Sequence, residues 1–251
     1  MPVATARTYM DAAQTAGVRS MLRLIAGEFA MCDCIVQPVS SKDSLALFAQ
    51  RDSHGGRFGA EVARADLYSA SSHKPHDRQN LIKPNMQVSA IRRRGGHLEC
   101  IKVRWGWAPI WTVGTMPPLT HLPLHLVMRS RVFDQIKREG RVLVAVDGWY
   151  QSQEPAPGSR INPLTYTTSR QSAPIFLAAL AQATETPNGC DGLALVTYGD
   201  IASKQQRMLA FTADDAIEWL EPDLGWEQAQ SIVARLGGMD EAIGQRLGNG
   251  R

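Results

Sequence analysis

The sequence lacks a long apolar segment and has few cysteines. No apolar run among its 251 residues approaches the roughly 18 residues that a membrane-spanning helix requires. Residues 1–30 lack the compact apolar block and the small-residue cleavage site of a secretory signal. The four cysteines are Cys32, Cys34, Cys100 and Cys190. They are too scattered for a zinc site, which needs two close pairs of cysteines. We therefore expect a cytoplasmic protein with reduced thiols and no membrane association.

Cofactor motifs are missing as well. The sequence contains no Gly-rich phosphate loop, no metalloprotease helix motif and no nucleotide-cofactor signature, so we expect neither a metal nor another cofactor. It also contains no internal repeat. Its hydrophobic content of 44% is ample for the core of one domain. We place that single domain at residues 31–251, behind a leader or mis-assigned extension at residues 1–30.

Positive charge is concentrated between residues 83 and 104. The whole chain has a formal net charge of only +3, yet this stretch holds six basic residues and one acidic residue, Glu99. The sequence Arg-Arg-Arg-Gly-Gly at 92–96 suits a solvated hairpin turn, and the same charge would suit a contact with nucleic acid. The basic residues are Lys83, Arg92, Arg93, Arg94, Lys102 and Arg104.

Alternation of apolar and polar residues predicts a strand-rich body from residue 86 onward. A hairpin is expected at 86–103, around the Gly-Gly turn at 95–96. Further strands are predicted at 141–146, 164–168, 175–181 and 193–197. Helices are predicted at 130–139, 212–220 and 226–236. The sum is an α+β domain with a strand-dominated centre.

Prolines and small polar residues predict irregular stretches between these elements. Residues 54–79 resemble a long surface loop with little core. The aromatic stretch 105–111 contains Pro109, so it is a turn or edge segment rather than a central strand. Prolines at 117, 118 and 123 predict an extended loop in which His121 and His125 lie, rather than a helix that would bring the two histidines together.

Three stretches carry a family resemblance. They read RWGWAPIW (104–111), SRVF (130–133) and GRVLVAVDGWY (140–150), and together they resemble the SOS-response-associated peptidase family, the abasic-site processing proteins. Members begin Met-Cys-Gly-Arg, and the resemblance places that start on Met31-Cys32 and continues to about residue 220. It implies a twisted, barrel-like sheet of mixed or antiparallel strands flanked by a few helices.

The resemblance implies a covalent chemistry for Cys32. In the family, the initiator methionine is removed and the exposed cysteine captures the ring-opened aldehyde of an abasic deoxyribose in single-stranded DNA. A thiol and an α-amine on adjacent carbons close a thiazolidine ring with one aldehyde, and an α-amine with a pKa near ~7.7–8 is partly neutral in cells. Cys32 can react in this way only if residues 1–30 are absent, and we favour a true start at Met31 as the explanation.

The resemblance further implies a role in the SOS response to DNA damage, at the nucleoid when the protein acts on DNA. The implied partner is single-stranded DNA with abasic sites, and we assume that a monomer binds it. Four residues correspond to DNA-facing positions: Pro84, Trp111, Arg131 and Arg207. Trp105, Trp107 and Trp149 are either core anchors or platforms for bases.

Several catalytic positions of the family hold other residue types here. His121 stands for an asparagine, Gln151 for a glutamate, and a histidine falls on Lys204 or Gln205. The glutamate and histidine do acid and base work in the family, whereas an amide does not titrate. The catalytic set is therefore reduced to Cys32, with His121 and Gln151 as candidate substitutes, and peptidase capacity should be impaired.

Three functions stay open at this point. The first is a DNA-damage protein that binds single-stranded DNA and crosslinks to abasic sites through Cys32. The second is a catalytically depleted homologue that only binds and shields single-stranded DNA. The third is a repurposed fold that binds another ligand, with His121 and His125 as its new features.

Overall fold

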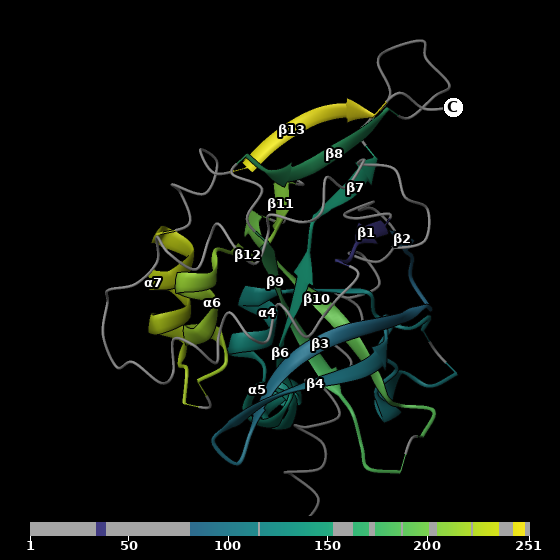
Figure 1. Ribbon diagram of the computed structural model, residues 1–251. Helices are drawn as coiled ribbons and strands as arrows, with labels where there is room; N and C mark the ends of the chain where they lie inside the picture. The colour runs from purple at the N-terminus through teal and green to yellow at the C-terminus, as the bar shows by residue number, and fades with distance from the viewer. Residues whose placement is uncertain are drawn as a thin grey trace, which may run out of the picture.

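Strands predominate in the structure, and a few short helices lie beside them (Figure 1). This computed structural model describes residues 34–38, 81–114, 116–152, 163–170, 174–186, 188–200, 205–221, 223–235 and 243–248. Our expectations for the leader at 1–30 and for the loop at 54–79 concern residues outside this set. No helix within the described ranges is long and apolar enough to cross a membrane.

The smaller of two sheets has five strands in the order β13-β8-β7-β1-β2, and every neighbouring pair is antiparallel. Its strands are β1 (Cys34–Val36), β2 (Leu81–Ile82), β7 (Gly148–Ser152), β8 (Leu164–Ser169) and β13 (Ile243–Gly248). The short strand β1 lies between β2 and β7. It therefore depends on partners that are distant in the sequence.

The larger sheet follows the order β11-β10-β9-β6-β3-β4, while β12 pairs with β9 and β5 pairs in parallel with β10. Its strands are β3 (Gln87–Arg94), β4 (His97–Arg104), β5 (His121–Pro123), β6 (Arg141–Val146), β9 (Ile175–Gln182), β10 (Gly192–Asp200), β11 (Gln205–Met208) and β12 (Ala210–Phe211). Just after β4, Trp105 forms a single parallel bridge with Leu193 of β10. The sheet thus curls back on itself without closing. The expected barrel-like sheet is therefore present as an open, curled sheet.

The strand β6 shows how the sequence builds two apolar layers. All six of its residues are buried. The valines at 142, 144 and 146 belong to an inner cluster, whereas Leu143 and Ala145 belong to an outer cluster, because successive side chains of a strand point to opposite faces. The smaller sheet adds Ile35 and Trp149 to the inner cluster, so the two sheets share one core.

Helices cover the outer cluster. They are α4 (Leu124–Arg129), α5 (Asp134–Glu139), α6 (Ala213–Trp219) and α7 (Trp226–Arg235), with short 3-10 turns η2 (Ile110–Thr112) and η3 (Arg131–Phe133). Trp219 ends α6 and donates its indole N–H to the carbonyl oxygens of Val142 and Ala179, at 3.1 and 3.3 Å. Arg141 donates to the carbonyl oxygens of Glu221 and Leu224, which holds the connection between α6 and α7.

The structure confirms the predicted α+β class and most predicted elements. The hairpin, the four further strands and the helices at 212–220 and 226–236 occur with ends shifted by three residues at most. The helix predicted at 130–139 is divided into the 3-10 turn η3 and the α-helix α5. The extended loop predicted around the prolines is wrong, because His121 opens β5 and His125 lies in α4. Pro123 is compatible with both elements, since it ends the strand and precedes the helix, where no backbone N–H is required.

Candidate functional site

The strands β1 and β7 bring the cysteine segment beside the Asp-Gly-Trp-Tyr stretch. Cys34 pairs with Tyr150 in antiparallel register, and its side chain is buried. Gln151 follows on β7 and is half-buried. Burial, with a smaller contribution from the Cys34 thiol, raises the pKa of Tyr150. Cys32 lies outside the described residues.

The Asp147-Gly148 step carries the chain from one sheet to the other. Asp147 donates its backbone N–H to the carbonyl oxygen of Val36 at 2.8 Å, which ties β1 to the end of β6. A Cβ atom on Gly148 would lie 2.4 Å from the carbonyl oxygen of Thr167, so only glycine allows β7 to approach β8 this closely. The step is a bend between two strands of different sheets and not a hairpin turn.

His121 is a buried polar group on β5. Its Nδ1 lies 3.0 Å from Thr120 Oγ1, and its ring meets the Trp105 ring edge-on, with centroids 5.9 Å apart. Its Nε2 is buried and has no hydrogen-bond partner within the described ranges. Burial lowers the pKa of His121 from 6.5 to about 4. The neutral imidazole therefore has one ring nitrogen available to donate or accept a hydrogen bond.

His125 does not join His121 in a common site. The two histidines lie on α4 and β5, so their spacing of four residues does not place them on one helix face. Burial, and less strongly Arg129, lower the pKa of His125. In the part of the chain that the structure describes, no group of three or more His, Cys, Asp or Glu side chains could hold a metal ion.

The strand β11 carries the last family-like stretch. Arg207 is exposed on it, Gln205 begins it, and Lys204 lies outside the described residues. The neighbour Gln206 is buried instead: its Oε1 accepts from Thr197 Oγ1 at 3.0 Å, and its amide nitrogen donates to a carbonyl oxygen of β10 at 3.0 Å. These bonds fasten β11 to β10.

The inner cluster links the strands β1, β7, β10 and β11. Leu195, the register partner of His121, and Met208, the neighbour of Arg207, belong to this cluster. Ile35 and Trp149 join it from the smaller sheet. Residues adjacent to the family-like positions thus pack in one apolar core, although they come from four separate parts of the chain.

Trp111 and Arg131 form a second group on the helix-covered side. Trp111 is half-buried, and its ring lies edge-on to those of Trp107 and Phe133, with centroids 6.3 and 6.0 Å apart. Arg131 opens the 3-10 turn that contains Phe133. Its side chain is exposed and has no ion pair with any described residue. Phe133 thus connects two of the predicted DNA-facing residues.

Pro84 lies in the turn between β2 and β3, away from that group in the sequence. Asn85 follows it with a φ of 71° and donates its backbone N–H to the carbonyl oxygen of Trp105 at 2.7 Å. Gly106 has a φ of 139°, a conformation that glycine favours. The Pro84 turn is therefore attached to the start of the aromatic stretch.

The remaining tryptophans of the family-like stretches are core anchors. Trp105, Trp107 and Trp149 are 0%, 3% and 5% exposed, which leaves no face on which a base could stack. Trp107 donates its indole N–H to Gln182 Oε1 at 3.2 Å, as buried indoles usually do. Only the half-exposed Trp111 remains as a platform among these four.

The three consecutive arginines of the basic hairpin are paired with glutamates, one in the hairpin and two in other parts of the chain. The ion pairs are Arg92–Glu99 at 2.5 Å, Arg93–Glu221 at 3.4 Å and Arg94–Glu185 at 2.8 Å. The pairing raises the pKa of Arg94 and lowers that of Glu185. Of the two alternatives for this stretch, the structure favours the solvated hairpin.

Sequence reasoning missed two features of this region. One is Gln206, which has no pattern to separate it from the adjacent Gln205. The other is a cavity of about 390 Å³ that Trp111 lines. Its walls come from β3, β4, β9, α5 and η2. No local sequence motif can predict a cavity that such distant elements form together.

Known proteins resemble this chain in sequence and in fold. The chain belongs to the SOS response associated peptidase (SRAP) family, whose family model matches residues 45–242. A relative is the abasic site processing protein YedK of Escherichia coli strain K12. The two are 26% identical over 209 residues, which cover 81% of this chain and 86% of YedK. The resemblance inferred from the sequence is thereby confirmed.

Solved structures of lower identity share the fold. A phage-related protein from Bordetella bronchiseptica superposes with a TM-score of 0.61 at 19% identity, over 87% of this chain and 95% of that one. A protein from Bacteroides thetaiotaomicron gives a TM-score of 0.57 at 12% identity, over 86% and 91%. At these identities the likeness supports the architecture alone.

Proposed function

We propose that this protein acts in the response to DNA damage by binding single-stranded DNA and capturing abasic sites covalently through Cys32. One observation carries the proposal: the register of β1 on β7 aligns Cys34 with Tyr150, directly before Gln151. Two residue steps separate Cys32 from Cys34, a reach of at most about 7 Å. Membership of the SRAP family and the likeness to an abasic site processing protein support it.

The capture reaction requires Cys32 to be the N-terminal residue. The neutral α-amine attacks the aldehyde carbon of the ring-opened deoxyribose, and loss of one water leaves a carbon–nitrogen double bond. The Cys32 sulfur then bonds to the same carbon, its proton passes to the nitrogen, and a thiazolidine ring closes. No oxidant or reductant is consumed.

Several residues have proposed roles beside Cys32. Gln151 can hydrogen-bond to the sugar, but its amide cannot relay a proton. His121 is neutral, and its buried Nε2 has no hydrogen-bond partner among the described residues, so we assign it the place of the missing acid and base groups. Pro84, Trp111, Arg131 and Arg207 would hold the strand by stacking and phosphate contacts.

A crosslinking assay tests the proposal. Protein translated from Met31 is mixed with single-stranded DNA that carries one abasic site, and adducts are resolved on a denaturing gel. The 251-residue form and Cys32→Ala run beside it, and Cys100→Ala controls for another thiol, since Cys100 is exposed. A heat-stable adduct from the Met31 and Cys100→Ala forms alone is expected. Absence of an adduct from every form contradicts covalent capture.

Binding without capture is the second candidate function. The observation in its favour is that Gln151 cannot titrate while Trp111 and Arg131 remain accessible. It predicts salt-sensitive binding to single-stranded DNA that survives Cys32→Ala, with no adduct.

A further inference from the structure

The cavity beside Trp111 has the size and access of a small-ligand site. Its volume of about 390 Å³ falls within the range of roughly 300–1,000 Å³ that is typical for such sites. Ile110 on its rim is 77% exposed, and the lining residues Gln135, Glu139 and Thr184 are exposed as well. The cavity therefore opens to solvent and is not an internal packing defect.

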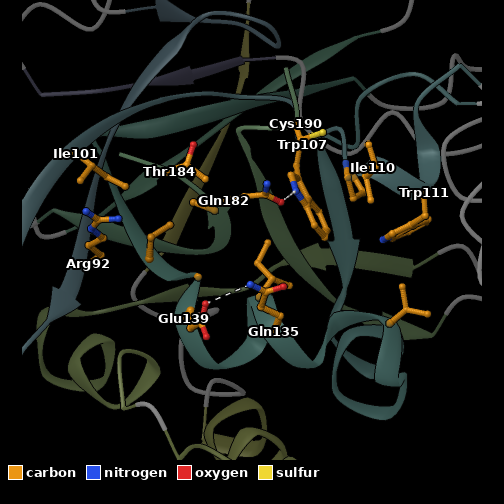
Figure 2. A pocket seen from close by; sticks show the side chains of 17 residues that line it. Arg92, Ile101, Trp107, Ile110, Trp111, Gln135, Glu139, Gln182, Thr184 and Cys190 are labelled. Atoms are coloured by element: carbon orange, nitrogen blue, oxygen red, sulfur yellow. Dashed lines mark hydrogen bonds between the residues drawn. The ribbon is translucent and has the colours of Figure 1, made fainter. Parts of the chain in front are cut away.

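One wall of the cavity is aromatic and fixed in place. Figure 2 shows the Trp107 indole and the Gln182 amide pointing toward each other, with Ile110 and Trp111 on one side of them. Trp111 is also held edge-on against Trp107. Rigid indole and aliphatic surfaces favour a flat apolar ligand face, because ordering them costs no further conformational entropy.

The other walls carry hydrogen-bonding groups. Gln135 Nε2 lies 3.5 Å from Glu139 Oε2, a long separation that leaves most of the capacity of both groups for a ligand. Gln182 Oε1 accepts from Trp107, and among the described residues no acceptor is bonded to its amide nitrogen, which leaves that nitrogen for a ligand. The ligand that fits is therefore planar and has polar edges.

The charges of the cavity exclude a phosphate inside it. Arg92 lines it, but its guanidinium is paired with Glu99 at 2.5 Å. Glu139 adds a carboxylate, which would repel an anion and accept hydrogen bonds from an amino group. Two exposed cations directly precede lining residues in the sequence: Arg131 before Val132, and Arg138 before Glu139.

From these observations we propose that the cavity receives one unpaired base of single-stranded DNA and prefers a base with an exocyclic amino group over thymine. Glu139 accepts from the amino group, the Trp111 indole covers the base face, and Arg131 contacts the phosphate outside. The proposal rests on the proposed function, since it names a second contact for the same DNA strand. It assigns the protein a base preference in addition to its recognition of a missing base.

Equilibrium binding to homopolymers tests the proposal. Fluorescence anisotropy at fixed ionic strength compares oligo-dC, oligo-dA and oligo-dT of equal length on the full chain. We expect oligo-dC and oligo-dA to bind about 5- to 10-fold tighter than oligo-dT, the lower part of the discrimination that a good base contact provides. Glu139→Gln, which removes the anionic acceptor, and Ala183→Phe, which places a ring in the cavity, should reduce the preference to about twofold or less.

Controls separate the cavity from general effects. Glu227→Gln makes the same charge change on α7, outside the cavity, and should keep the wild-type preference. Equal binding of all three homopolymers by the wild type overturns the inference, as does a preference that survives both Glu139→Gln and Ala183→Phe. The abasic-site adduct is measured in parallel. It tests the proposed function separately, because neither substitution changes Cys32.

Discussion

The three consecutive arginines of the β3–β4 hairpin form ion pairs, whereas two polar groups in the segment 105–133 have no partner among the described residues. The three arginines at 92–94 each pair with a glutamate. In the segment 105–133, the Nε2 of His121 and the guanidinium of Arg131 have no such partner among the described residues. A run of basic residues therefore does not by itself mark a DNA contact, and a single arginine with no partner is the better candidate.

The largest expected effect concerns the buried imidazole of His121. Its pKa is about 4 in the folded protein and 6.5 ordinarily. Between these values the unfolded chain binds a proton that the folded chain does not. The free energy of unfolding should therefore fall as the pH drops from about 6.5 to about 4, by up to about 3 kcal/mol. His121→Asn removes this contribution, which urea unfolding across that pH range would measure as a shallower decline.

The hairpin offers the matched control for this experiment. His97 is exposed at the turn, and His97→Asn should keep the steep pH dependence of the wild type. An unchanged slope in His121→Asn would contradict a neutral, buried imidazole in the native protein.

Trp111→Ala should weaken binding of single-stranded DNA by about 1–3 kcal/mol, or roughly 5- to 150-fold, because stacking on one base is lost. Trp111→Phe retains an aromatic face and should recover part of the affinity. Fluorescence anisotropy with a labelled oligonucleotide measures both variants. In the hairpin, Leu98→Ala removes a partly buried apolar side chain without removing a stacking platform. If Leu98→Ala loses as much DNA affinity as Trp111→Ala, stacking on Trp111 is refuted.

Arg131→Ala should lower DNA affinity about 3- to 10-fold and reduce the salt slope of log Kd by about 0.7, the value for one phosphate contact on a single strand. Arg93→Ala removes an arginine that is already paired with Glu221, so its affinity and slope should stay close to those of the wild type. A salt titration of both variants makes the comparison. Equal slopes for Arg131→Ala and the wild type would remove Arg131 from the DNA contact.

Much of the fold could be predicted because long strands have a readable period. The hairpin follows from alternation around a Gly-Gly turn, and β6 from a continuous apolar run with buried residues on both faces. The strands β1, β5 and β12 have only three, three and two residues, too few to show a period. Their existence depends on ladder partners that lie far away in the sequence.

The candidate site was predictable only as separate stretches. The sequence indicates Trp111 and Arg131, but not that Phe133 contacts Trp111 from the turn that Arg131 opens. It shows the arginines of the hairpin, but not the glutamate at 221 that pairs with Arg93. Such partners come from other elements of the fold. For that reason, composition does not show whether an arginine is already paired with a carboxylate or can still contact DNA.

Releasing the hairpin arginines should have the smallest effect. Glu185→Gln frees Arg94, whose side chain is 58% exposed, and DNA affinity should rise by about twofold or less because screening by salt weakens an exposed charge. Glu227→Gln makes the same charge change on α7 and isolates the local contribution. A much larger gain for Glu185→Gln alone, of about tenfold, would mean that the DNA strand already passes along the hairpin. The ion pairs would then regulate binding. The two regions would both lie along the DNA strand, and they would differ only in whether their arginines are already paired with glutamates.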